Sequence, residues 1–236
     1  MSSKFGFLHK LEFPQTLLSA LIASLNPAII HNIEKYYILK KVHYLCAIED
    51  LRGDYLEFGV FTGSSFAHSI RCYKKMKYLS EKLDNMNFYG FDSFDGFGEL
   101  NDSDKHPFYT DNNFKTSINT VNKRISKAAG QLKYRLVSGF FSDSLQSGPS
   151  KYGIEKASII FVDSDTYSSS LDALMFCKEL IQPGTYIILD DFYSYRGNSQ
   201  KGVKRAFDEL ILITGMDLRR VFTYGMGGAV FVVDKL

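Results

Sequence analysis

Tryptophan is absent from this sequence, and cysteine, proline and excess charge are all scarce. Among 236 residues there are three Cys and five Pro, and 28 Lys and Arg against 26 Asp and Glu leave a formal net charge of +2. The cysteines, Cys46, Cys72 and Cys177, are too few and too scattered for a disulfide framework or a zinc site, so we expect reduced, buried thiols. The near-neutral charge gives no overall electrostatic footprint for nucleic acid and argues against such a partner.

A long hydrophobic run is also missing. The most apolar early stretch, residues 17–30, contains Ser19, Ser24, Asn26 and Pro27, and it is shorter than the ~20 residues that a membrane-spanning helix needs. Residues 1–10 lack the basic region and apolar run of a signal peptide. We therefore expect a cytoplasmic protein without a membrane span.

Aromatic residues, in contrast, are abundant. They make up 15% of the chain, from 20 Phe and 15 Tyr, within a hydrophobic share of 45% and a charged share of 23%. These shares are typical of a globular protein and exclude wholesale disorder, a collagen-like fibre and a coiled coil. The aromatic excess predicts either a thick core or ring surfaces that line a ligand pocket.

Two kinds of pattern divide the chain near residue 50. Residues 1–50 have amphipathic helical spacing, broken at Pro14 and Pro27, and carry no chemical motif, so they predict a helical cap that serves as a substrate cover or a dimer surface. Residues 51–236 alternate between strand and helix. Strands are predicted at 55–60, 87–91, 132–137, 158–162, 185–189, 218–224 and 229–233, and helices at 66–83, 114–129, 166–181 and 201–213.

This alternation predicts an α/β domain with a mostly parallel sheet that is covered by helices on both faces. The last two runs differ, because only the short glycine turn at 225–228 joins them, and so they predict a C-terminal antiparallel hairpin. Ligands of such sheets bind beyond the carboxyl ends of the strands. The residues that follow each strand are therefore the informative ones.

The first of these loops reads Glu57-x-Gly59-x-x-x-Gly63 and leads into Ser64 and Ser65. Its glycines allow a sharp turn and a close approach of a ligand, and the helix start offers free amide donors. The spacing differs from the dinucleotide pattern G-x-G-x-x-G, and the loop lacks the lysine of a P-loop. An acidic residue within the strand favours a ligand with an amino group. A plain strand-to-helix turn is the alternative.

Carboxylates end three other strands. Asp92 is placed to accept hydrogen bonds from the ribose hydroxyls of an adenosine ligand, or to act as a turn aspartate. Asp163 follows one very apolar run, and Asp190 and Asp191 follow the next. Three carboxylates that converge in one crevice repel each other unless protons or a cation neutralise them, and oxygen ligands suit Mg²⁺, Mn²⁺ or Ca²⁺. Helix capping by Asp165 and simple turns are the alternative.

With these residues in view, the chain resembles a known family. Residues 57–65 look like the S-adenosylmethionine loop of class I methyltransferases, and residues 91–97, 162–167 and 183–192 resemble the macrocin O-methyltransferase group, which methylates sugar hydroxyls. The resemblance implies a Rossmann-like class I methyltransferase fold with a mostly parallel seven-stranded sheet. It also implies S-adenosylmethionine-dependent, divalent-metal-assisted O-methylation of a sugar or glycosylated natural product, with a small-molecule or saccharide acceptor and a possible homo-oligomer.

The resemblance also implies roles for individual residues. Those around S-adenosylmethionine would be Glu57, Gly59, Gly63, Ser64, Ser65, Asp92, Ser93, Gly139, Phe140 and Asp143. Those that bind Mg²⁺, or Mn²⁺ or Ca²⁺ in its place, would be Asp163, Asp190 and Asp191. Asp163 would also be the general base, with Asp165 and His106 as alternatives. Rings could be offered to a sugar, or pack in the core, by Tyr109, Tyr167, Phe192 and Tyr193.

Two other functions compete with this interpretation. Asp163-Ser164-Asp165 also matches the D-x-D pattern of metal-dependent glycosyltransferases, which would leave the Glu57–Gly63 loop and Asp190-Asp191 without a role. A non-catalytic S-adenosylmethionine-binding subunit would have no need of three aspartates at the strand ends. The identity of the acceptor depends on residues 1–50 and 93–113, which carry no motif.

Overall fold

The computed structural model describes residues 11–79, 86–109 and 114–236. Three parts of the predictions lie outside these residues. They are the first ten residues of the helical cap, on which the expectation of no signal peptide depends, the end of the helix predicted at 66–83, and residues 110–113 of the polar stretch after the second strand.

One seven-stranded sheet forms the centre of the protein, in the order β3-β2-β1-β4-β5-β7-β6. The first five strands along the chain are parallel, and β7 joins them antiparallel to both β5 and β6. The strands are β1 (Asp54–Phe58), β2 (Phe88–Asp92), β3 (Tyr134–Ser138), β4 (Ala157–Val162), β5 (Tyr186–Leu189), β6 (Asp217–Tyr224) and β7 (Gly228–Lys235). The predicted Rossmann-like, mostly parallel sheet with a C-terminal antiparallel hairpin is confirmed.

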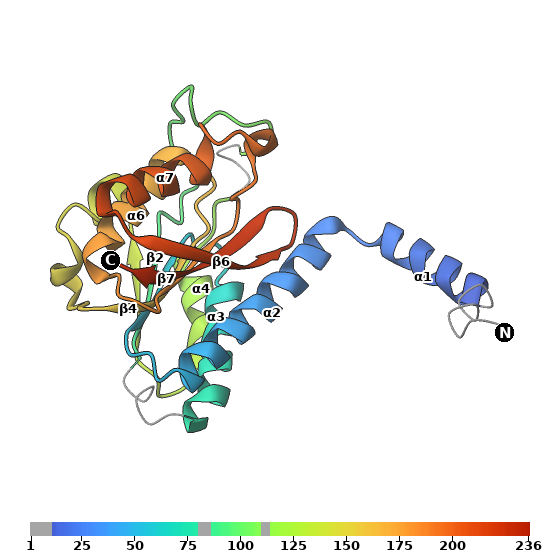
Figure 1. Ribbon diagram of the computed structural model, residues 1–236, viewed down its shortest axis with the longest axis horizontal. Coiled ribbons are helices and arrows are strands. Elements are labelled where there is room, and N and C mark those ends of the chain that lie inside the picture. The colour runs from blue at the N-terminus through green and yellow to red at the C-terminus, as the bar shows by residue number, and fades with distance from the viewer. Residues whose placement is uncertain (1–10, 80–85, 110–113) are drawn as a thin grey trace.

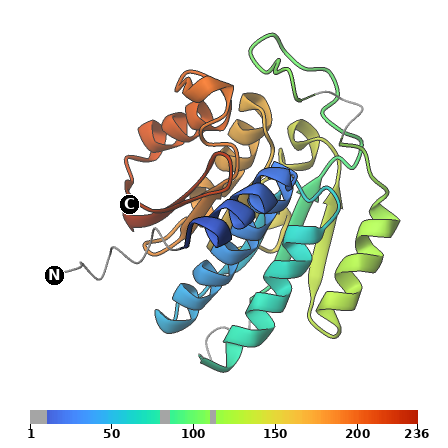
Figure 2. The same cartoon turned by 90° about the vertical axis from the view of Figure 1, so that its right-hand side faces the viewer.

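Helices cover both faces of the sheet (Figure 2). On one face lie α2 (Pro27–Ile48), α3 (Ser64–Met76) and α4 (Ile118–Ala129), and on the other lie α5 (Phe141–Ser144), α6 (Tyr167–Cys177) and α7 (Gly202–Thr214). The short 3₁₀ turns are η2 (Lys77–Leu79), η5 (Pro149–Tyr152), η6 (Lys178–Leu180) and η7 (Tyr195–Gly197). The helix predicted from residue 114 starts later, at Ile118, because Phe114 instead packs its ring against Phe61 and Phe97.

The strands are apolar because each is buried on both faces. Along β1, Leu56 and Phe58 point into the core under α5, α6 and α7, while Tyr55 points into the core under α2, α3 and α4. Phenylalanine rings fill both cores, with Phe91 stacked on Phe58 and Phe88 beside Tyr55. Much of the aromatic excess therefore serves packing. The three cysteines are free and buried, as predicted.

The N-terminal helices α1 (Glu12–Ser24) and α2 meet at a sharp bend of 97°. Asn26 causes the break, because its side chain accepts a hydrogen bond from the Ala28 amide at 2.9 Å and Pro27 starts the new helix. Figure 1 shows α2 lying along the body and α1 projecting away from it. Among the described residues, no single helix is long and apolar enough to cross a membrane, and only α1 and α2 taken together pass that test.

Candidate active site

The pairing of the strands brings the predicted site residues to one edge of the sheet. Phe58 is level with Phe91 on β2 and with Val162 on β4, and Val162 is level with Leu189 on β5. The next residues, Gly59, Asp92, Asp163 and Asp190, therefore stand in one row. They border a pocket of about 660 Å³, which α2 and the loops after the strands complete.

Gly59 is required by backbone geometry. Its φ is +95°, and a Cβ atom at this position would lie 1.8 Å from the carbonyl oxygen of Asp163. Gly63 belongs to the same turn. Its φ is +74°, and it packs against Val121 and Ile125 of α4. Of the two glycines, only Gly59 borders the pocket. The loop after β1 therefore packs directly on the main chain of Asp163 at Gly59, and this contact places the loop at the border of the pocket.

Gly59→Ala is expected to lower the free energy of unfolding by about 3–5 kcal/mol or to prevent folding, because positive φ and a collision with rigid backbone act together. Gly153→Ala is the matched control, since Gly153 has a φ of +74° with nothing within 4 Å of the added Cβ. The control should lose only about 1–2 kcal/mol, from the left-handed conformation alone. Urea unfolding of both variants measures the difference, and equal losses would contradict the collision.

Glu57 lies beneath the pocket and is fully buried. Its carboxylate accepts hydrogen bonds from the hydroxyl of Tyr55 and, at 2.6 Å, from that of Ser65. Burial raises the pKa of Glu57 to about 7, although these hydrogen bonds act in the opposite direction. Ser64 and Ser65 do border the pocket. Glu57 therefore holds the start of α3 in place through Ser65 instead of facing the pocket itself.

Asp92 at the end of β2 borders the pocket and organises the loop beside it. One carboxylate oxygen accepts from the amides of Val60 and Phe61, both at 2.7 Å, and the other accepts from the Phe94 amide at 2.6 Å. Burial raises the pKa of Asp92, and these amides counteract the rise. Because a carboxylate has about four acceptor positions, Asp92 retains one for a ligand hydroxyl.

Of the predicted cofactor residues that follow β3, only Phe140 borders the pocket. The ring of Phe140 borders the pocket, as does Ser93 after β2. Gly139 has a φ of +141° and its amide donates to the Asp92 carbonyl at 3.0 Å, so it joins two loops without forming part of the pocket wall. Asp143 lies on α5 and is exposed, away from the residues that line the pocket.

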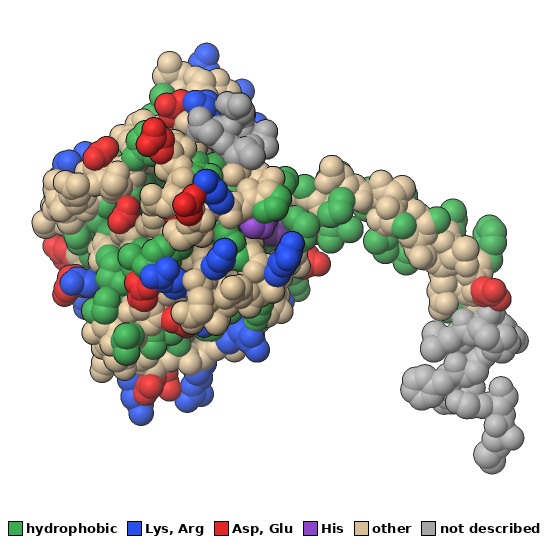
Figure 3. Space-filling view, turned by 90° about the horizontal axis from the view of Figure 1, so that it is seen from above, with side chains coloured by type: hydrophobic (Ala, Val, Ile, Leu, Met, Phe, Trp, Pro, Cys, Tyr) green, Lys and Arg blue, Asp and Glu red, His purple; other side chains and the backbone are tan. Residues whose placement is uncertain are grey.

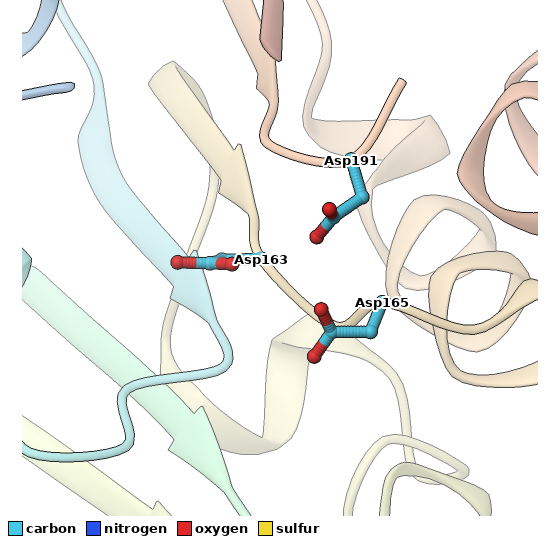
Figure 4. Close-up of side chains that lie close together, drawn as sticks. All are labelled: Asp163, Asp165 and Asp191. Atoms are coloured by element: carbon cyan, nitrogen blue, oxygen red, sulfur yellow. The ribbon is translucent and has the colours of Figure 1, made fainter. Parts of the chain in front are cut away.

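A group of carboxylates occupies the other side of the pocket. Asp163, Asp165 and Asp191 each offer an oxygen within 4.8 Å of the other two (Figure 4). Burial, followed by the charge of Asp190, raises the pKa of Asp163 well above its usual value. Burial, followed by the charge of Asp191, does the same for Asp165. Like charges at such distances favour the uptake of protons or of a cation.

Asp190 lies beside this group and is bonded by side chains of α2 and β6. Its Oδ2 lies 2.8 Å from the ammonium of Lys35 and 3.1 Å from the imidazole Nε2 of His31, and its Oδ1 accepts from the Tyr224 hydroxyl at 2.6 Å. Lys35 also bonds Asp163 at 2.9 Å. Burial alone would raise the pKa of Asp190, but Lys35 and His31 hold it below its usual value. Burial alone would lower the pKa of Lys35, yet the two carboxylates raise it.

The donor set fits a divalent cation. The four carboxylates of Asp163, Asp165, Asp190 and Asp191 face one lysine and one histidine. Even with His31 protonated, surplus negative charge remains, and its carriers are oxygen atoms, which hard divalent cations prefer. The sequence grouped Asp163, Asp190 and Asp191, whereas in the structure Asp165 lies within the close group and Asp190 is engaged by α2.

Lys35, His31 and Tyr224 are site residues that the sequence did not reveal. One signal for Lys35 was present, because it shares a helix face with Ile38, Leu39 and Val42. A charged residue on a buried face needs a partner. His31 lies one helical turn before Lys35 on the same face of α2, whereas Tyr224 lies on the hairpin with no comparable pattern.

The long loop after β2 closes the pocket with rings. The Tyr109 hydroxyl donates a hydrogen bond to Asp191 at 3.1 Å. The ring of His106 stacks on the Tyr109 ring, with the two centroids 4.3 Å apart. The buried Asp104 fixes this loop by accepting from the Tyr167 amide and the Ser168 hydroxyl at the start of α6. Tyr109, His106 and Tyr193 all border the pocket. Part of the aromatic excess therefore lines the pocket, in agreement with the expectation of ring surfaces around a ligand.

The sequence is similar to that of a known family of methyltransferases. The family described as macrocin-O-methyltransferase (TylF) matches residues 35–211. Mycinamicin III 3''-O-methyltransferase of Micromonospora griseorubida is 29% identical over 153 residues, which are 59% of this chain and 55% of that protein. The chain thus matches little more than half the length of this relative.

Solved structures share the fold. The O-methyltransferase NovP superimposes with a TM-score of 0.66 at 18% identity, over 85% of this chain and 79% of that one. An O-methyltransferase from Bacillus cereus in complex with SAH has a TM-score of 0.56 at 17% identity, over 84% of this chain and 81% of the other. At these identities the likeness establishes the architecture, which is the Rossmann-like one expected.

Proposed function

Since the chain belongs to the macrocin-O-methyltransferase family, we propose that it transfers a methyl group from S-adenosylmethionine to a hydroxyl of a sugar or a glycosylated natural product. One observation carries this proposal. The matched segment, residues 35–211, contains both sides of a single pocket, with Gly59 and Asp92 on one side and the carboxylates of Asp163, Asp165 and Asp191 on the other. A cofactor and an acceptor can therefore meet there.

The residues near Gly59 suit S-adenosylmethionine. Gly59 brings the main chain of its loop to the border of the pocket, Asp92 keeps an acceptor position for a ribose hydroxyl, and the Phe140 ring offers a flat apolar surface for a base. When bound, the cofactor supplies a methyl group on a positively charged sulfur. The protein's own contribution on this side is to bind and orient, which matters for a direct displacement because positioning supplies much of the rate.

The carboxylates would serve the acceptor. We propose Asp163, Asp190 and Asp191 as ligands of Mg²⁺ or a similar cation, with Asp165 as a further oxygen donor in the same group. Such a cation would hold the acceptor and lower the pKa of its hydroxyl. Asp163 would take up the hydroxyl proton. Its position at the border of the pocket, within the close carboxylate group, supports this role. Asp165 and His106 are the alternative bases in the same pocket.

A methyl-transfer assay tests the proposal. The purified chain is incubated with S-adenosylmethionine and a panel of deoxysugar glycosides and catechol, with Mg²⁺ or with a chelator, and products are identified by mass spectrometry. We expect a singly methylated glycoside that chelation suppresses. Methylation of catechol alone would contradict the sugar acceptor. Full turnover in excess chelator would contradict the role of the metal.

A further inference from the structure

We propose that two copies of this chain form a symmetric dimer in which α1 of each copy packs along the exposed face of α2 in the other. This inference is independent of the proposed function. It starts from the projecting helix α1, which has no buried residue. Figure 1 shows the helix extending from the body as an arm.

The arm is apolar on one face. Its large side chains recur at the spacing of a single helix face, and each is between 37% and 79% exposed. They are Phe13, Leu17, Leu18, Leu21, Ile22 and Leu25. An exposed stripe of this size marks an interaction surface, because a soluble monomer seldom leaves one uncovered. The arm cannot fold back continuously on its own α2, since the capped break at Asn26 and Pro27 sets the 97° bend.

A second apolar stripe lies on the outer side of α2. While Ile38, Leu39 and Val42 bury the inner side of this helix, five large side chains on its outer side are about half exposed. They are Ile29, Ile33, Tyr37, Tyr44 and Ile48. From Ile29 to Ile48 this stripe runs about 28 Å, which is longer than the roughly 20 Å of α1. It can therefore receive a whole α1 from another copy.

The areas agree with a stable dimer. If each of these partly exposed side chains loses on the order of 60–100 Å² of surface, each copy buries roughly 700–1,000 Å², against the ~800 Å² per partner of a standard interface. Because each copy has both an arm and a receiving stripe, the contact occurs twice around a two-fold axis. Such reciprocity closes the assembly at two chains.

A lipid surface fits this arm less well. Helices that lie on membranes carry Lys and Arg on their polar side, whereas residues 12–34 contain no Lys or Arg and only two charges, Glu12 and Glu34. Figure 3 agrees, since the arm shows hydrophobic side chains and no blue ones between the body and the grey residues. A second copy of the chain is the better match, because its receiving stripe is apolar apart from Lys40 and Lys41, which lie between Tyr37 and Tyr44.

Sedimentation equilibrium of the full chain tests the dimer. We expect twice the mass of the chain for the wild type, and the mass of one chain for both Leu17→Asp/Leu21→Asp on the arm and Ile33→Asp on the receiving stripe. The arm variant should stay folded, because no residue of α1 is buried within a single chain. Its melting temperature should no longer rise with protein concentration, because the stabilisation that association adds is lost. Leu212→Asp on α7, where Leu212 is 84% exposed, is the control and should remain a dimer.

Three results would overturn the proposal. The first is a monomeric wild type. A parallel flotation with phosphatidylcholine–phosphatidylglycerol vesicles then identifies a membrane helix if the monomer floats, and excludes one if it does not. The second is a dimer that survives the arm substitutions. The third is a dimer that survives Ile33→Asp, since the arm would then dock elsewhere.

Discussion

Asp163→Asn is expected to lower the rate of methyl transfer by about 10²–10⁴-fold, the contribution of a well-placed general base. Asp163 borders the pocket, belongs to the close carboxylate group and bonds Lys35, so the substitution removes an anion from the centre of the acceptor side. The affinity for S-adenosylmethionine should stay within a few-fold, because Gly59 and Asp92 form the cofactor side. Single-turnover kinetics and calorimetry measure the two quantities separately.

Asp234→Asn is the matched control, since Asp234 forms an ion pair with the exposed Arg219 on the hairpin and is not among the residues that line the pocket. It should keep the wild-type rate. The same assay on Asp165→Asn and Asp190→Asn then assigns the roles. A rate for Asp163→Asn equal to that of the control would contradict both proposed roles of Asp163. A loss confined to Asp165→Asn would identify Asp165 as the base.

Lys35→Met is expected to lower the free energy of unfolding by about 3–5 kcal/mol, the usual cost of removing one partner from a buried ion pair. The ammonium group is largely buried and bonds both Asp163 and Asp190. Its loss leaves Asp163 without its cationic partner and leaves Asp190 with only the imidazole of His31. A divalent cation can replace that charge. Mn²⁺ should therefore restore part of the lost stability, and should bind the variant more tightly than the wild type.

Urea unfolding with and without Mn²⁺ measures this effect. Lys204→Met is the control, because Lys204 forms a partly exposed pair with Asp208 on α7, where such pairs contribute about 0–1 kcal/mol. A loss for Lys35→Met no larger than for the control would contradict the buried ion pair. A loss of the expected size that Mn²⁺ leaves unchanged would show that the lysine does not share its position with a cation.

Local sequence patterns predicted the sheet well. Short runs such as Ile159-Ile160-Phe161-Val162, bounded by glycine or aspartate, are apolar because both faces of a parallel sheet are covered. The same pattern placed Gly59, Asp92 and Asp163 at one edge, since parallel strands end together. Helix boundaries were less predictable. The start of α4 depends on ring contacts of Phe114 with Phe61 and Phe97, which are distant in sequence.

The contacts that decide the chemistry of the site were beyond local patterns. The family resemblance placed Glu57 beside the cofactor. In the structure its buried carboxylate accepts hydrogen bonds from Tyr55 and Ser65, which the sequence did not predict. Asp190 was grouped with Asp163 and Asp191 by position alone. Its partners Lys35 and Tyr224 come from α2 and β6, at opposite ends of the chain, and only the folded arrangement brings them together.

Calorimetric titration of the purified chain tests the central claim most directly. S-adenosylmethionine, S-adenosylhomocysteine, a UDP-sugar and NAD are each added with and without Mg²⁺. We predict that the two adenosyl ligands bind with one site per chain, with or without the cation, and that the UDP-sugar and NAD do not bind. Binding of the UDP-sugar alone, dependent on Mg²⁺, would contradict methyl transfer and favour a glycosyltransferase.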